Sequence, residues 1–333
     1  MKCFVKVTNQ KLNNYLRDND VYLCLLRKSR IRAKHLAIME IMNSLKDLKL
    51  KFISNNPLGD VKGIIAVFIN RGKRHLVKSY LKNLGYTYKF YLLDFNDTNP
   101  KYVWKKHSFS LKHFYTQNEL LYQAQSSHLR KFKILGEDNS IKDVFGYRGD
   151  GSKVGKRALP VEDARCMVNL TSPSVINSLL DPFAGAGSII YQGKYINENL
   201  KLYSIDIDPI LEPGLKSYGA KHFVGCSTNV KLGNIIIDAI VTEVPFYERA
   251  TSDIKKALSN LNNYLSKNGK VIIMCSKKQK QELKNHLAKI GLYKVFTANI
   301  NRKGTSVAIL FYTKASDYDH KCREFTEMLK YVY

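Results

Sequence analysis

Apolar runs of strand length alternate with helix-like stretches through the second half of the chain. From about residue 160 onwards, buried-strand patterns are separated by segments in which apolar positions recur at helical spacing. The clearest strand is expected at 235–241, and an amphipathic helix is expected at 252–265, ending before Gly269. Because strands that alternate with helices build a parallel sheet covered on both faces, this half predicts an α/β fold.

The other expected elements of this half follow the same rhythm. A short strand closes at Leu179–Leu180 and runs into a Gly-rich turn, and the last two strands are expected to form a hairpin. Further strands are expected at 202–205, 222–224, 270–275, 293–299 and 306–312, and helices from the turn to 197, at 211–218 and at 279–290.

The N-terminal part gives a separate pattern that predicts a small α/β domain. Strands are expected at 3–7, 21–26, 63–69 and 86–93, and helices in a stretch ending near 48 and over 71–84. The polar, irregular stretch that follows indicates a linker or an edge extension. The predicted segments are a basic domain at 1–115, a linker and lead-in at 116–159, the main domain at 160–315 and a C-terminal helical tail at 316–333.

Positive charge is concentrated in the first third of the chain. The formal net charge is +26, and residues 1–115 hold 23 of the 54 Lys and Arg but only 7 of the 28 Asp and Glu. Such an excess attracts polyanions, of which nucleic acid is the usual one. A composition rich in Lys, Asn and Ile can also reflect an AT-biased genome. We favour nucleic acid because the excess lies in one segment.

Cysteine spacing and hydropathy limit the classes of protein that fit. The six cysteines form no Cys-x-x-Cys pair, which argues against a zinc site and a disulfide framework. The longest apolar runs, at 21–26, 63–69 and 235–241, are far shorter than the roughly 20 residues that span a bilayer. We therefore expect a cytoplasmic protein without metal or membrane, and the oligomeric state stays open.

The string LLDPFAGAGSII at 179–190 carries the first chemical signal. A strand runs into Asp181, and Gly185 and Gly187 lie in the turn before a helix. Ligands of doubly wound sheets bind at such strand ends, where glycines let a ligand approach the backbone. The dinucleotide fingerprint G-x-G-x-x-G is absent, because Ile190 stands where its third glycine belongs.

The next strand ends in the acidic segment SIDIDP. A carboxylate about 20 residues beyond the turn can accept hydrogen bonds from both ribose hydroxyls of a nucleoside, and we favour Asp206 for this role. For Asp208, which precedes Pro209, we favour a helix N-cap.

The motifs LLDPFAGAG, SIDIDP, DAIVTEVPF and LSKNGKVIIM together resemble class I S-adenosylmethionine-dependent methyltransferases. The similarity is strongest to the RNA methylase group that includes the tRNA guanine exocyclic-amine methyltransferases. The first motif of that group, D-P-x-C/A-G-x-G-T/S, matches 181–188, and the lead-in corresponds to a helix carrying Met167 and Asn169. The resemblance covers about 145–312. It implies a Rossmann-like sheet of seven strands, mostly parallel with a C-terminal antiparallel strand.

The resemblance also implies S-adenosyl-L-methionine as the cofactor. Where the group often has Gly-Asp to accept from the adenine amino group, this chain has Gly225 and then Cys226. A thiol is a poor acceptor, so backbone groups or Ser227 are expected to hold adenine. The residues expected to bind the cofactor are Asp181, Phe183, Ala184, Gly185, Gly187, Asp206, Ile207, Cys226 and Ser227.

The fourth motif implies the methyl acceptor. The family pattern Asp/Asn-Pro-Pro-Tyr/Phe is here Glu243-Val244-Pro245-Phe246. A side-chain oxygen and a backbone carbonyl can accept the hydrogens of an exocyclic amine, while the aromatic ring stacks on the base. Glu243, Pro245 and Phe246 are therefore the expected catalytic residues, with Tyr247 as a possible second ring. Glu is longer than Asp, and Val replaces the proline that stiffens the turn, so amine specificity stays open.

These observations predict methylation of an exocyclic amine in structured RNA, either tRNA or rRNA. A DNA amine methyltransferase shares the same acceptor chemistry and stays an alternative. A nucleic-acid-binding protein that kept the fold and lost catalysis is another, because the third and fourth motifs both depart from the family pattern. Lysines after the fifth strand of the main domain are expected either to contact phosphates or only to begin a charged helix; they are Lys277, Lys278 and Lys280.

Overall fold

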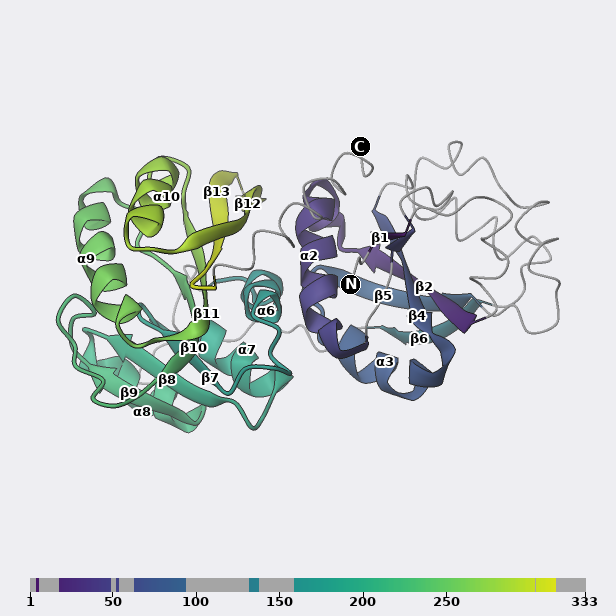
Figure 1. The fold of residues 1–333 in the computed structure, drawn as a ribbon, viewed down its shortest axis with the longest axis horizontal. Helices are drawn as coiled ribbons and strands as arrows, with labels where there is room; N and C mark the ends of the chain where they lie inside the picture. The colour runs from purple at the N-terminus through teal and green to yellow at the C-terminus, as the bar shows by residue number, and fades with distance from the viewer. Residues whose placement is uncertain are drawn as a thin grey trace. The chain divides into compact units, whose positions relative to one another are not determined.

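The computed structural model describes residues 4–5, 18–48, 52–53, 63–93, 132–137, 159–302 and 304–315. The chain forms two compact units, one of Met1–Ser140 with Arg323–Tyr333 and the other of Ile141–Cys322 (Figure 1). The predicted C-terminal tail at 316–333 lies outside the described residues, as does most of the predicted linker.

The N-terminal unit contains a four-stranded antiparallel sheet in the order β4-β2-β5-β6. Its edge strand β6 lies inside the segment predicted as a linker or edge extension and pairs with β5, while the rest of 116–158 lies outside the described residues. The helix predicted over 71–84 is shorter, because a 3-10 turn at Arg71–Lys73 precedes α3. The elements are β1 (Phe4–Val5), β2 (Asn19–Leu26), η1 (Lys28–Ala33), α2 (Lys34–Ser44), η2 (Lys46–Leu48), β3 (Phe52–Ile53), β4 (Ile64–Asn70), η3 (Arg71–Lys73), α3 (Arg74–Leu81), β5 (Thr87–Leu93) and β6 (Phe132–Glu137).

A buried carboxylate fixes the turn that leads from α3 into β5. Glu40 of α2 is fully buried and accepts hydrogen bonds from the backbone N–H groups of Gly85 at 2.5 Å and Tyr86 at 3.0 Å. Arg27 donates from Nε to the carbonyl of Gly85 at 2.8 Å. Because a buried charge is stable only when it is hydrogen-bonded, these contacts join α2 to the sheet at one defined place.

The second unit is a seven-stranded sheet in the order β12-β13-β11-β10-β7-β8-β9. Its central strands are parallel, and β13 pairs antiparallel with both β11 and β12. The predicted sheet is confirmed, including its antiparallel end. The strands are β7 (Ser178–Asp181), β8 (Lys201–Asp206), β9 (Ala220–Val224), β10 (Ile237–Glu243), β11 (Leu265–Ser276), β12 (Tyr293–Arg302) and β13 (Thr305–Thr313).

Helices cover both faces of this sheet (Figure 1). The helices α9 and α10 bury their apolar sides in one core with the central strands, through residues such as Ile254, Leu258 and Leu283. The opposite face carries α6 and α7, which contact each other. The helices and 3-10 turns are α6 (Val161–Leu170), α7 (Ser188–Ile196), η5 (Pro209–Leu211), α8 (Glu212–Ser217), η6 (Glu248–Ala250), α9 (Thr251–Asn262) and α10 (Lys280–Lys289).

Two predicted elements of this unit have wrong boundaries, and the strand expected over 235–241 is β10 at Ile237–Glu243. The helix expected over 252–265 ends at Asn262, and Leu265 instead begins β11. Leu265 pairs with Ile237, and the register then shifts before Ala239 pairs with Lys270. A leucine at helical spacing is therefore used to start the next strand, where pairing with β10 outweighs local helix propensity.

The part of the chain that the structure describes holds no helix long and apolar enough to cross a membrane. Within the same residues, no three His, Cys, Asp or Glu side chains gather as a possible metal site. The described cysteines are all free thiols. Cys24, Cys166 and Cys275 are buried, and Cys226 is exposed.

Candidate active site

The turn after β7 depends on two glycines for different reasons. Gly187 caps α7 with a φ of +82°, and a Cβ on it would lie 2.9 Å from Cδ2 of Leu215. Gly185 has a φ of +48°, and a Cβ there would meet nothing within 4 Å. Gly187 is therefore required by close packing as well as by its left-handed backbone, while Gly185 borders open space.

The Asp181 carboxylate supports this turn from inside the protein. Asp181 is only 2% exposed and accepts hydrogen bonds at Oδ1 from the hydroxyl of Thr242 at 2.7 Å and the N–H of Phe183 at 3.2 Å. Burial raises the pKa of this carboxyl to about 7, although both hydrogen bonds favour its ionised form. Asp181 thus ties the turn to β10.

Asp206 links the end of β8 to the same turn. Its Oδ2 accepts from the N–H of Gly185 at 2.8 Å, and its Oδ1 accepts from the N–H of Asp208 at 3.1 Å. A carboxylate has about four acceptor positions, so each oxygen keeps one for a ligand. Asp208 caps the following 3-10 turn by accepting from the N–H of Ile210 at 3.0 Å, as its predicted N-cap role requires.

A cavity of about 770 Å³ opens beside these strand ends. It extends from Asp206 to the turn after β10 and to the hairpin of β12 and β13. Its lining residues are Pro160, Pro182, Phe183, Asp206, Ile207, Gly225, Cys226, Ser227, Glu243, Val244, Pro245, Phe246, Tyr247, Arg302 and Thr305.

One end of the cavity combines an apolar side chain with polar groups. Ile207 is 72% exposed although it is a large aliphatic residue. Ser227 is buried, and its hydroxyl donates to the carbonyl of Pro182, so the serine oxygen can still accept a hydrogen bond. The exposed thiol of Cys226 lies 3.1 Å from Oγ1 of Thr228.

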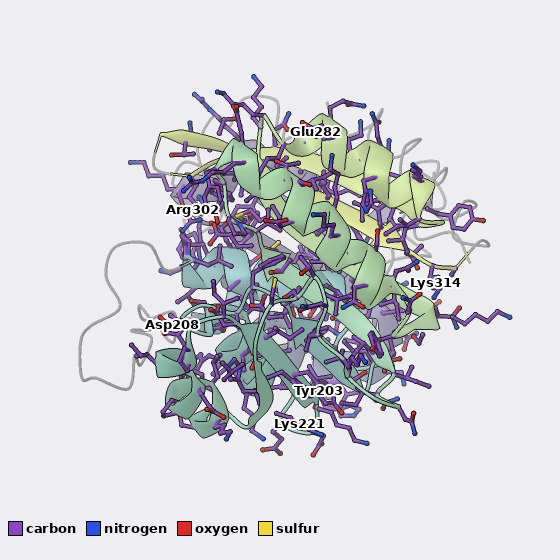
Figure 2. All side chains as sticks on the ribbon, turned by 90° about the vertical axis from the view of Figure 1, so that its left-hand side faces the viewer. Tyr203, Asp208, Lys221, Glu282, Arg302 and Lys314 are labelled. Atoms are coloured by element: carbon purple, nitrogen blue, oxygen red, sulfur yellow. The ribbon has the colours of Figure 1, made fainter. Side chains whose placement is uncertain are left out.

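The other end of the cavity holds an ion pair that the sequence did not reveal. Nη1 of Arg302 donates to Oε1 of Glu243, and these side chains are only 14% and 20% exposed. Burial raises the pKa of Glu243 above its ordinary value, and the adjacent guanidinium opposes that rise. Figure 2 shows Arg302 on the same side of the unit as Asp208, while Lys314 lies on the other side.

The turn after Glu243 carries aromatic side chains into the cavity. Val244 is buried, and its N–H donates to the carbonyl of Met274 at 3.0 Å. Phe246 is partly buried, and the ring of Tyr247 is 56% exposed under the guanidinium of Arg249, whose Cζ lies 5.3 Å from the ring centroid. A carboxylate and two aromatic rings thus face one space.

The structure brings most of the sequence-predicted residues together. Phe183, Asp206, Ile207, Cys226 and Ser227 line one cavity with the predicted catalytic residues Glu243, Pro245 and Phe246. Asp181, Ala184, Gly185 and Gly187 form the turn beside it and are not among its lining residues.

Two of the three lysines after β11 have partners among the described residues. Lys278 pairs with Glu248 at 2.6 Å, and Lys280 donates to Oδ1 of Asn299 at 2.9 Å. Lys277 is exposed. The expected phosphate contact of these lysines stays a prediction.

The sequence carries a clear relationship to a named enzyme. The protein named "Probable tRNA (guanine(10)-N2)-dimethyltransferase" from Methanothermococcus thermolithotrophicus is 30% identical over 131 residues, which are 34% of this chain and 80% of that protein. The chain belongs to the class I S-adenosylmethionine-dependent methyltransferases. No family profile matches this methyltransferase.

Two solved structures are similar to this chain over different shares of its length. TrmN from Thermus thermophilus is 13% identical with a TM-score of 0.47, and the match covers 89% of this methyltransferase and 99% of that chain. The N-methyltransferase NodS from Bradyrhizobium japonicum, in complex with S-adenosyl-L-homocysteine, is 13% identical with a TM-score of 0.41 over 50% of this chain and 94% of that chain.

The cavity of this methyltransferase fits its cofactor, S-adenosyl-L-methionine. The space beside Gly185 is open, the Asp206 carboxylate keeps acceptor positions, and Ile207 presents an apolar surface. These groups suit the backbone approach, the ribose and the adenine ring of a nucleoside.

Proposed function

We propose that this methyltransferase transfers the methyl group to an exocyclic amine of a base in structured RNA. The observation that carries the proposal is the placement of Glu243 and Phe246 in the cavity that Asp206 also lines. A carboxylate accepts hydrogens from an amine, and an aromatic ring stacks on a base. Both groups therefore stand where a methyl acceptor must approach a bound cofactor.

On the cofactor side, Asp206 accepts hydrogen bonds from the ribose hydroxyls, and Ile207 packs on the adenine ring. The Ser227 hydroxyl donates its proton to the carbonyl of Pro182, so the same oxygen accepts a hydrogen bond from the adenine amino group. Asp181 and the glycines act indirectly, by shaping the turn that borders the cavity.

On the acceptor side, Glu243 makes the amine a better nucleophile. The lone pair of an exocyclic amine is delocalised into the base, and hydrogen bonds from the amine to Glu243 favour a more pyramidal nitrogen. Arg302 takes one acceptor position of the carboxylate and keeps the group oriented. When bound, the cofactor would supply a methyl group on a sulfonium: the N–C bond would form as the C–S bond breaks, the sulfur would keep that electron pair, and the proton lost by the nitrogen would pass to solvent water.

RNA is favoured over DNA by the name of a related enzyme, whereas the basic N-terminal third suits the phosphate backbone of either polymer. The related enzyme is named for a guanine amine in tRNA. The N-terminal third carries the basic excess that attracts a phosphate backbone. A complex that depends on this charge weakens steeply as salt concentration rises.

Replacing Asp206 by Ala is expected to weaken binding of S-adenosylmethionine between about 10- and 100-fold, the loss that accompanies hydrogen bonds to a charged group. Calorimetry with purified protein measures the dissociation constant. Asp208→Ala is the matched control, because Asp208 does not line the cavity and caps the turn that follows it, and it is expected to bind within about threefold of wild type. Equal affinities of the Asp206 variant and wild type for S-adenosylmethionine would show that Asp206 does not bind the cofactor.

The proposed function is tested by incubating the protein with methyl-labelled S-adenosylmethionine and either total RNA or genomic DNA, and then digesting the polymer to nucleosides. The expected product is a nucleoside labelled on an exocyclic amine, recovered from RNA only. Label in DNA would establish the DNA alternative. Label on a ring carbon or a ribose oxygen would contradict the amine assignment.

A further inference from the structure

A buried glutamine joins the acceptor turn to the end of the neighbouring strand. Gln279 is 1% exposed and stands at the N-cap of α10, directly after the exposed Lys277 and Lys278. Its Nε2 donates to the carbonyl of Pro245 at 2.8 Å and to the carbonyl of Tyr247 at 3.3 Å. These residues flank Phe246, so one amide group holds the backbone on both sides of that ring.

The other atom of the same amide is bound as well. Oε1 of Gln279 accepts from the N–H of Ser276 at 3.2 Å and from the hydroxyl of Ser276 at 3.0 Å. Because carbonyls only accept and a backbone N–H only donates, the partners fix which end of the amide is nitrogen. Glutamine is the side chain that can satisfy all four contacts at this length.

This arrangement compensates for a departure from the family pattern. The fourth motif of the family has a proline where this chain has Val244, and proline restricts backbone freedom. Val244 instead donates its N–H to Met274, a bond that a proline could not make. That bond holds the first part of the turn to β11, and Gln279 holds the second part.

We propose that Gln279 is a positioning residue for the methyl acceptor, a role that rests on the proposed acceptor function of the turn. By holding Pro245 and Tyr247, it fixes the direction of the Phe246 ring and the path of the chain after Glu243. It does not line the cavity and touches no group on the cofactor side among its bonded partners. Loss of Gln279 therefore affects the acceptor and leaves cofactor binding intact.

The test uses Gln279→Met, which removes both donors without burying a charge, and Gln279→Glu, which places a carboxylate against two carbonyls. Gln281→Met is the matched control, because Gln281 is exposed on the same helix and, among the described residues, bonds to side chains of α10. With the nucleic acid that wild type methylates, both Gln279 variants are expected to lose about 100-fold in kcat, as a displaced acceptor requires. Their dissociation constants for S-adenosylmethionine are expected to stay within about twofold of wild type.

Hydrogen exchange supplies a readout that does not depend on activity. Peptides covering 243–248 are expected to exchange faster in Gln279→Met than in Gln281→Met, with other strands unchanged. Wild-type kcat, or unchanged exchange in this peptide, would overturn the positioning role. If wild type methylates no amine, the proposed function fails, and the exchange experiment still decides whether Gln279 holds the turn.

Discussion

Replacing Glu243 by Ala is expected to lower the rate of methyl transfer between about 100- and 1,000-fold, the loss typical of removing one group that stabilises a transition state. Its carboxylate is the charged acceptor at the predicted acceptor turn of the cavity. The variant also leaves Arg302 beside the acceptor without its partner carboxylate. Binding of S-adenosylmethionine is expected to stay near the wild-type value, because Glu243 ends β10, which β7 and β8 separate from β9, the strand before Ser227.

Single-turnover rates at saturating cofactor measure this effect. Glu243→Gln is expected to be intermediate, since the amide keeps one acceptor oxygen while losing the charge. Glu248→Ala is the control, because Glu248 is a highly exposed carboxylate that pairs only with Lys278 among the described residues. A Glu243→Ala variant that transfers at the rate of this control would exclude Glu243 from the acceptor site.

Replacing Asp181 by Asn is expected to stabilise the protein at pH 8 and much less at pH 5. Burial raises the pKa of this carboxyl from 3.8 to about 7, so the folded state binds a proton more tightly than the unfolded state. Wild-type stability from this group is present at low pH and is lost as pH rises through about 7. Asn keeps an oxygen for Thr242 and Phe183 and carries no charge.

Urea denaturation of wild type and variant at both pH values measures the difference in their free energies of unfolding. The free-energy advantage of Asp181→Asn is expected to grow by roughly 2 to 3 kcal/mol between pH 5 and pH 8. Asp253→Asn is the control for the general effect of exchanging Asp for Asn, because Asp253 is 69% exposed on α9. An advantage of equal size at both pH values would mean that Asp181 does not titrate in this range.

Most of the fold could be predicted because its signals are local. Apolar periodicity and the Gly-rich turn identify the strands and helices of the main domain, and the alternation of these elements predicts the sheet. The end of α9 was missed because the choice between helix and strand at Leu265 depends on pairing with Ile237. Ile237 lies in another strand, so no local sequence signal near Leu265 indicates this pairing.

The residues of the candidate site that stand in sequence motifs could also be predicted. Asp206, Glu243 and Phe246 stand in motifs at strand ends, and the cavity brings them together. Arg302 lies 59 residues from Glu243, and Gln279 lies 34 residues from Pro245. Neither stands in a motif, so only the folded sheet shows that they meet the acceptor turn. Asp181 is the opposite case, since its motif indicates ligand contact while its carboxylate is buried against Thr242.

The strand order at one edge of the sheet has a consequence for how the protein is completed during synthesis. β12, which ends at Arg302, pairs with β13, and β13 pairs with β11. On the ribosome, Arg302 therefore emerges before the strand that anchors it. β12 can therefore take its place at the edge of the sheet, where Arg302 meets Glu243, only once β13 lies between it and β11.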